Sequence, residues 1–310
     1  MRYAGTVRYA GRMRSWMLVA LALTACEGSI ADLDAAPVDG SARDAARADA
    51  APDDDAGRAD AQPDAPEDGG PVDPCAGRIF CEDFETYDVG GPPGGPWEVS
   101  VNRATVAIDE ARATSGSRAV RIATEGGDGS YRRGYLTLAG APVFPVPENT
   151  LHGRMMIYVA QLPGVGQRVH WTNVQAEGPI PGMESITALY RYGGMNDDRW
   201  LANYETRGAA SDCWRNSDTA MQAARWVCME WRFSEPEDRM QLWVDGAEIA
   251  DAAVTERGDG CVDDGWDGNW YGGAWDRIAL GWEHYQQSIA HEVWIDDVVI
   301  DDAPIGCPAP

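Results

Sequence analysis

The heptapeptide Trp243-Val244-Asp245-Gly246-Ala247-Glu248-Ile249 shows most clearly which kind of fold this sequence forms. An Asp-Gly pair between two short alternating runs is typical of a tight β-hairpin turn. Other short runs are equally rich in Val, Ile, Trp and Tyr and bounded by Gly, Pro or Asp; they cover residues 155–160, 225–233, 239–244, 277–282 and 292–300. No segment carries a long apolar stripe of helical period. We therefore predict an all-β domain, a two-sheet sandwich or jelly roll of about a dozen strands.

The N-terminus has the features of an export signal. Residues 1–25 contain four arginines and no acidic residue, and the apolar run Trp16–Leu23 is too short to span a membrane stably. The run closes on Leu23-Thr24-Ala25-Cys26, which resembles a bacterial lipobox. We expect Cys26 to be acylated, which would make the chain a lipoprotein of the outer membrane or cell surface. Ordinary signal cleavage nearby, leaving Cys26 as a free thiol, is the alternative.

Residues 26–74 are predicted to form a disordered acidic linker. Between 31 and 74 the chain has twelve Asp, one Glu and three Arg, and no aromatic residue. Such a segment cannot bury enough apolar surface to offset the entropy of ordering it, and its charges repel each other. We interpret it as a spacer that holds the domain of residues 75–310 away from the membrane. An acidic ion-binding segment is the alternative.

The charge balance excludes several functions. The chain has 50 acidic and 25 basic residues, for a formal net charge of -25, and every basic residue is arginine. The lack of lysine excludes lysine Schiff bases and P-loop lysines. The excess of acid argues against nucleic acid as a partner, and against membrane contact other than through the lipid anchor. We expect a monomer.

Six cysteines in residues 75–310 predict up to three disulfides in an exported protein. Cys213 and Cys228 flank a polar stretch between two aromatic-rich runs, so we predict that they pair. The other four, whose pairing the sequence leaves open, are Cys75, Cys81, Cys261 and Cys307.

An ordered series of motifs is similar to a known family. The motifs are Ile79–Glu85, Thr114–Val120, Trp226–Trp231, Leu242–Gly246 and Val293–Ile300. Together they resemble the concanavalin-A-like jelly rolls of fungal cellulose-induced secreted proteins and their bacterial homologues, which are similar in fold to glucuronan and alginate lyases. The resemblance covers nearly all of residues 79–307. It implies a curved β-sandwich whose concave sheet binds an extracellular polysaccharide in a groove.

The resemblance also implies a structural Ca²⁺ where the first and last strands meet. Glu85, Ser115 and Asp297 fall on the positions that hold the ion in this family. Oxygen atoms from carboxylates and hydroxyls are the ligands that Ca²⁺ prefers. The alternative is that Asp297 only solvates a strand edge.

The lyase resemblance implies β-elimination, which requires a group that neutralises the uronate carboxylate, a base and an acid. The residues that match loosely are Arg154, His170, Gln175 and Tyr285. His170 and Gln175 are five residues apart, so they point to opposite faces of a regular strand unless a bulge intervenes. Arg154 and His170 could instead be structural residues.

Aromatic and amide side chains are the candidates for stacking on and hydrogen bonding to sugar. We predict that the groove is lined by Trp171, Asn173, Tyr190, Tyr192, Trp282 and His284. For Tyr190 and Tyr192, ordinary half-buried positions in a sheet are the alternative. A non-catalytic carbohydrate-binding or adhesion module of the same fold remains the alternative to a lyase.

The sequence does not determine whether the glycan is a charged polyuronate or a neutral polysaccharide. Removing the signal (+4) and residues 26–74 (-11) from the total of -25 leaves -18 on the folded part, which disfavours polyuronates at long range. A local cluster of arginines could compensate in the groove, and its candidates are Arg132, Arg133, Arg154, Arg168 and Arg191. A neutral glycan needs no such compensation.

Overall fold

The computed structural model describes residues 75–209, 211–263 and 268–308, without the side chains of 259–263. The predictions for the signal peptide, for Cys26 and for the linker of residues 26–74 lie outside these residues. Among the described residues, no helix has the length and apolar character needed to cross a membrane.

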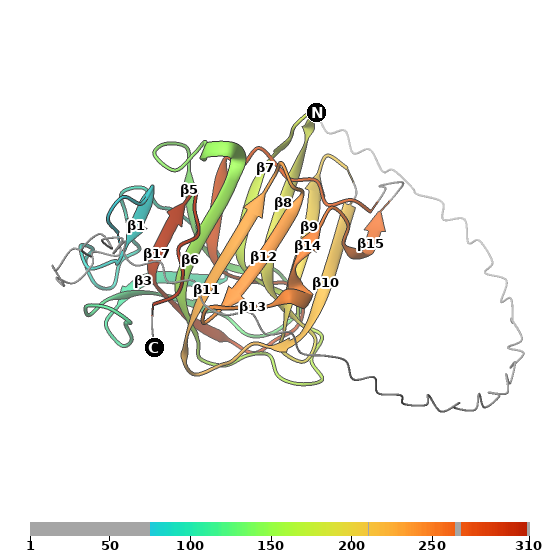
Figure 1. Cartoon of the computed structure of the whole chain (residues 1–310). Helices are drawn as coiled ribbons and strands as arrows, with labels where there is room; N and C mark the ends of the chain where they lie inside the picture. The colour runs from blue at the N-terminus through green and yellow to red at the C-terminus, as the bar shows by residue number, and fades with distance from the viewer. Residues whose placement is uncertain (1–74, 210, 264–267, 309–310) are drawn as a thin grey trace, which may run out of the picture. The chain divides into compact units, whose positions relative to one another are not determined.

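Two antiparallel sheets form the domain, which confirms the predicted all-β jelly-roll sandwich (Figure 1). The first sheet has the order β13-β12-β11-β6-β17-β4-β3, with β1 on β17 and β14 on β12. Its strands are β1 (Phe80–Glu82), β3 (Ala104–Asp109), β4 (Ala119–Thr124), β6 (Thr150–Val159), β11 (Trp226–Ser234), β12 (Arg239–Val244), β13 (Ala247–Glu248), β14 (Val254–Thr255) and β17 (His291–Asp301).

The second sheet, which we call the groove sheet, has the order β15-β10-β9-β8-β7-β16-β5-β2. Its strands are β2 (Glu98–Asn102), β5 (Arg132–Ala139), β7 (Trp171–Ile180), β8 (Met183–Met195), β9 (Arg199–Arg207), β10 (Ser211–Ala220), β15 (Asp259–Asp263) and β16 (Arg277–His284). Two short 3₁₀ turns, η1 (Pro147–Asn149) and η2 (Ala250–Ala252), complete the described elements.

The hairpin that the sequence predicts at Asp-Gly is present. Val244 at the end of β12 pairs with Ala247 at the start of β13. The two residues between them, Asp245 and Gly246, have φ values of 50° and 81°. Positive φ at both central positions is the geometry that matches the twist of the strands, and Asp and Gly tolerate it well.

Aromatic side chains fill the space between the sheets. Trp171 on β7 stacks on Trp282 on β16, with ring centroids 5.4 Å apart and an interplanar angle of 11°. Phe233 of the first sheet stacks on Tyr192 of the groove sheet at 5.7 Å. Such contacts contribute about 1 kcal/mol each beyond the burial of apolar area. They fix which face of each strand of the groove sheet points inward.

The disulfide prediction for Cys213 and Cys228 is wrong. Cys228 bonds to Cys307, and Cys75 bonds to Cys81. Cys213 is bonded to a different cysteine. The reason is topological, because Cys213 lies on β10 and Cys228 on β11, which follow each other in the sequence but belong to different sheets.

Candidate functional site

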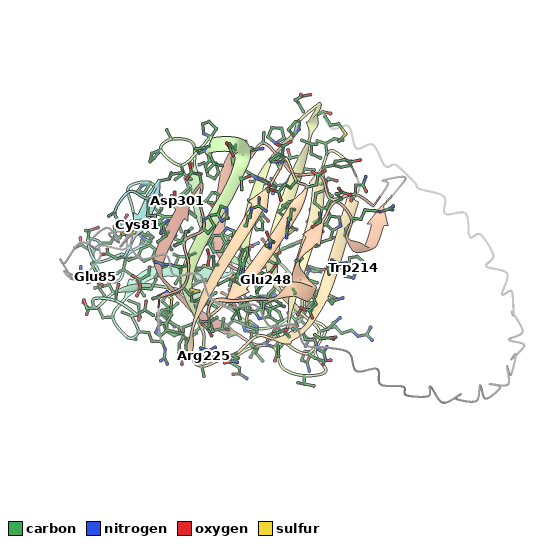
Figure 2. The ribbon with its side chains drawn as sticks, in the orientation of Figure 1. Cys81, Glu85, Trp214, Arg225, Glu248 and Asp301 are labelled. Atoms are coloured by element: carbon green, nitrogen blue, oxygen red, sulfur yellow. A yellow bond between two sulfur atoms is a disulfide. The ribbon has the colours of Figure 1, made fainter. Side chains whose placement is uncertain are left out.

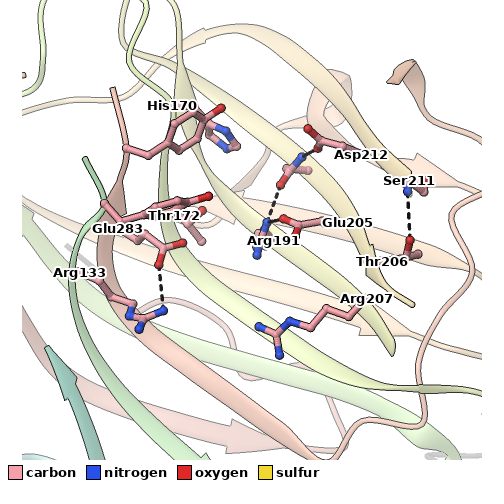
Figure 3. Close-up of a pocket in the computed structure, with 13 residues that line it drawn as sticks. Arg133, His170, Thr172, Arg191, Glu205, Thr206, Arg207, Ser211, Asp212 and Glu283 are labelled. Atoms are coloured by element: carbon pink, nitrogen blue, oxygen red, sulfur yellow. Dashed lines mark hydrogen bonds and ion pairs between the residues drawn. The ribbon is translucent and has the colours of Figure 1, made fainter. Parts of the chain in front are cut away.

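A groove of about 630 Å³ lies on the outward face of the groove sheet. Figure 3 shows its floor, to which β5, β7, β8, β9, β10 and β16 contribute side chains. A second hollow of about 220 Å³ extends it to β2 and shares Arg133, Arg191, Arg207 and Glu283 with it. The joined groove therefore crosses the strands from β10 to β2, a span of roughly 29 Å at a strand spacing of about 4.8 Å.

A bulge in β7 decides which side chains reach this groove. Thr172 pairs with Gly193 and Val174 pairs with Tyr192, so Asn173 is an extra residue between them. The strand therefore turns Trp171 and Val174 to the core and His170, Thr172 and Gln175 to the groove. This is the bulge that the five-residue spacing of His170 and Gln175 requires.

Arg191 on β8 lies at the centre of the groove floor. Its Nε donates a hydrogen bond to Oε1 of Gln175 at 2.6 Å, and its Nη1 donates to Oδ1 of Asn203 at 3.3 Å and to Oε2 of Glu205. Burial lowers the pKa of Arg191, but Glu205, Tyr135 and Glu283 together outweigh this effect and raise it above its ordinary value. The floor thus carries a fixed cation with an amide on each side, because Arg191 pairs with Gln175 on β7 and with Asn203 on β9. Figure 3 shows Arg191 beside Glu205.

An aromatic rim borders one end of the groove. The ring of His170 meets the ring of Tyr285 edge to face at 5.9 Å, and Tyr285 lies 5.5 Å from Tyr131. Burial, with the nearby Arg191 guanidinium, lowers the pKa of His170 to about 4. The imidazole is therefore neutral near pH 7, and one ring nitrogen has a lone pair free of a proton.

Two loops hold this rim in place. The buried guanidinium of Arg132 donates from Nη1 to the carbonyl oxygens of Asp128 and Ser130, both at 2.6 Å. The loop that follows β16 forms a bridge through Ser288 with Gly127, which lies in the loop before β5. Ser288 Oγ lies 2.8 Å from Nε2 of His291, a buried residue of β17. Tyr131 and Tyr285 thus sit on loops that are bound to each other and to the core.

Three of the four predicted catalytic residues face the groove, and Arg154 does not. His170 and Tyr285 line the larger hollow and Gln175 the smaller. Arg154 lies on β6 in the first sheet, where its Nη1 donates to the carbonyl oxygen of Gly306 at 3.1 Å. Assigning it to the groove is an error, because a strand pattern does not tell which of two sheets a strand joins.

The six predicted sugar-contacting residues are also misplaced, because all of them lie in the interior with at most 1% of their surface exposed: Trp171, Asn173, Tyr190, Tyr192, Trp282 and His284. The tyrosine hydroxyls donate to carbonyl oxygens inside the sandwich, Tyr190 to Trp270 at 2.6 Å and Tyr192 to Ala252 at 3.1 Å. The alternative interpretation of these tyrosines as sheet aromatics is the one that agrees with the structure.

The groove contains residues that the sequence analysis missed, among them Tyr131, Thr172, Glu205, Arg207, Asp212 and Glu283. A signal for some of them exists in the alternation of each strand. Glu283 stands between Trp282 and His284, as Arg191 stands between Tyr190 and Tyr192. Once the aromatic residues are assigned to the core, the polar residue between them must face the groove.

The three residues expected to bind Ca²⁺ meet at the loop 114–118. Ser115 Oγ donates to Oδ1 of Asp297 at 2.6 Å. The Glu85 carboxylate accepts hydrogen bonds from the backbone N–H groups of Ser117 at 2.7 Å and Arg118 at 2.6 Å. Glu85 lies near Cys81 at one end of the sandwich (Figure 2). Asp297 has φ 47° within a bulge of β17. The oxygen donors suit Ca²⁺, although no cluster of three acidic, histidine or cysteine residues that could hold a metal occurs in the described part of the chain.

Comparison with known proteins gives a family match over most of the domain. The model of the Cip1-like core domain of the polysaccharide lyase-like family matches residues 96–303. The structure of the cellulose-induced protein Cip1 superposes with a TM-score of 0.53 at 21% identity and covers 74% of this chain and 100% of Cip1, which shows a shared fold. An endo-β-1,4-glucuronan lyase from the fungus Trichoderma reesei superposes with a TM-score of 0.46 at 13% identity, covering 73% of this chain and 96% of that chain. No curated protein matches this sequence.

The buried imidazole of His284 predicts a loss of stability in acid. Burial, followed by the charges of His291 and Arg132, lowers the pKa of His284 from 6.5 to about 4. As the pH falls from about 6.5 to about 4, the unfolded chain takes up a proton that the folded chain does not, so the free energy of unfolding drops by roughly 3 kcal/mol from this group. Urea unfolding at a series of pH values measures the loss.

The control for this prediction is His284→Gln, whose amide oxygen can still accept the hydrogen bond from Nε1 of Trp282. The variant should unfold with a shallower dependence on pH in the same range, because it lacks the buried imidazole. An unchanged slope would show that His284 does not titrate in this way.

Proposed function

This chain belongs to the Cip1-like polysaccharide lyase-like family, and we propose that it is an exported protein that binds an extracellular polysaccharide across the groove sheet and cleaves it by β-elimination. The family match supports a polysaccharide as the ligand. The observation that supports cleavage is the presence in one groove of a neutral imidazole, a neighbouring tyrosine and a fixed guanidinium, those of His170, Tyr285 and Arg191.

The proposed reaction is an elimination at a uronic acid unit. His170 takes the proton from C5 with its free ring nitrogen, a double bond forms between C4 and C5, and the C4–O4 bond breaks. Tyr285 gives its hydroxyl proton to the leaving O4. Arg191, held by Gln175, donates hydrogen bonds to the carbonyl oxygen on C6, where negative charge develops. Each of these side chains lines one of the joined hollows.

The test is the appearance of the unsaturated sugar, which absorbs at about 232 nm. The purified protein is incubated with glucuronan, alginate and pectin, and His170→Gln and Tyr285→Phe are each expected to lower the rate by about 100-fold or more, the usual effect of removing a general acid or base. Tyr131→Phe is the matched control, because it removes a hydroxyl from the same rim and should keep the activity.

Binding without any unsaturated product would contradict the lyase and favour a non-catalytic carbohydrate-binding or adhesion module of the same fold. In that case the two active-site variants and the control should bind the glycan alike.

We also propose that Ca²⁺ binds at the loop 114–118 through Glu85, Ser115 and Asp297. Their oxygens would exchange hydrogen bonds within the protein for bonds to the ion.

A chelator is then expected to lower the melting temperature by roughly 5–10 °C relative to Ca²⁺ at about 100 times its Kd. Asp297→Asn should melt at the lower temperature, and the chelator should not change its melting temperature. Asp218→Asn, which replaces an exposed residue elsewhere on the domain, should behave as the wild type. A wild-type melting temperature that the chelator leaves unchanged would contradict the site.

We propose, finally, that Cys26 carries the lipid that anchors the protein to the bacterial envelope. Two lipid attachments hold a protein on a membrane much more firmly than one. Mass spectrometry of the protein extracted from membranes should find a diacylated cysteine at the mature N-terminus, and Cys26→Ser should release the protein into the soluble fraction. An unmodified Cys26 would contradict this proposal.

A further inference from the structure

The joined groove has no excess of positive charge. Four arginines and five carboxyl groups line its two hollows. The arginines are Arg133, Arg191, Arg207 and Arg277, and the carboxyl groups are those of Glu98, Glu177, Glu205, Asp212 and Glu283. The cluster of arginines that could have compensated for the acidic domain is therefore dispersed. Arg154 lies in the other sheet, and Arg132, the first residue of β5, is buried and donates to carbonyl oxygens of the preceding loop.

Each of these four arginines already has a carboxylate partner. Arg133 Nη1 lies 3.3 Å from Oε2 of Glu283, and Arg191 contacts Oε2 of Glu205. The other two share one partner, the nearly buried Glu177: Arg207 at 2.6 Å and Arg277 at 3.3 Å. Figure 3 shows the guanidinium groups of Arg133 and Arg191 turned toward these partners.

This pairing works against a fully ionised polyuronate. Such a glycan has one negative charge on every unit, and several units would fit in a groove that crosses seven strands. If Arg133 turned to a sugar carboxylate, Glu283 would lose its partner, and its side chain is only 13% exposed. Arg133 is 40% exposed, so solvent partly screens this pair, and separating it costs about 1 kcal/mol or less for each unit bound. If Arg207 turned, Glu177 would keep Arg277 but lose one of its two ion pairs. The acidic surface adds repulsion at long range.

We propose that the stretch of glycan in this groove is uncharged, and that the units cleaved are uronic acid esters. The inference rests on the proposed function and specifies the substrate class of the same site. An ester needs no cation to neutralise it, and it makes the C5 proton more acidic than a carboxylate does. The elimination then proceeds as written above, with the ester group unchanged on C6.

The contacts of Arg191 agree with an ester carbonyl as the acceptor. Nε and Nη1 are used by Gln175, Asn203 and Glu205. Among the described residues no hydrogen bond from Nη2 is found, so this nitrogen can donate to a carbonyl oxygen while the pair with Glu205 stays intact.

The experiment compares each polymer with its own ester: glucuronan, alginate and polygalacturonate, each as the free acid and as the methyl or propylene glycol ester. Binding is measured by titration calorimetry at low and high salt, and product at about 232 nm. We expect at least one ester to bind tenfold or more tightly than its acid and to be cleaved faster. Affinity for the acid should rise with salt, because salt screens repulsion.

Tighter binding of the free acid, with an affinity that falls as salt rises, would overturn this inference and leave the proposed polysaccharide function intact. Failure of every acid and every ester to bind would overturn both.

A charge variant gives an independent reading of the same claim. Glu283→Gln leaves Arg133 without its carboxylate partner, so affinity for the free acids should rise by about fivefold while affinity for the esters changes little. Glu125→Gln removes the same charge from an exposed position outside the groove and should change neither. If Glu283→Gln raised the affinity for the esters as much as the affinity for the acids, the ion pair of Arg133 and Glu283 would have no role in excluding charged glycans.

Discussion

The layer of stacked aromatic rings between the two sheets is the constraint on which the rest of this structure depends. Trp171 and Trp282 on adjacent strands, and Tyr192 against Phe233 across the sheets, leave no freedom in which face of β7, β8 and β16 turns inward. Because side chains alternate along a strand, burying these rings fixes which polar residues face outward. The groove is thus a consequence of core packing.

The bulge at Asn173 modifies this rule at the place where the chemistry is proposed. Without the extra residue, His170 and Gln175 would point to opposite faces of β7. With it, the imidazole, the amide and Arg191 share one surface. The bulge thus lets the same strand supply side chains to both the core and the groove.

The charges of the groove also depend on how the strands of the sheet are arranged. A guanidinium on the floor of a sheet is partly removed from water, and each one has a carboxylate partner on another strand of the same sheet. This pairing keeps the arginines oriented and also cancels their charge. A groove of this kind recognises a ligand by hydrogen-bond geometry and shape more than by net charge.

The class of fold, the Asp-Gly hairpin and the family could be predicted from the amino-acid sequence, because strand alternation and turn chemistry are local properties that short segments express. Through the family resemblance the sequence also predicted His170, Gln175 and Tyr285 as site residues, and all three line the joined groove. It could not assign strands to sheets, so Arg154 and the pair Cys213 and Cys228 were misplaced. The sequence analysis also assigned buried aromatic residues to the sugar-binding groove, because an aromatic ring can pack in a core as well as stack on a sugar. These points depend on the packing of the whole domain, because the face that a strand turns inward is set by its neighbours in space.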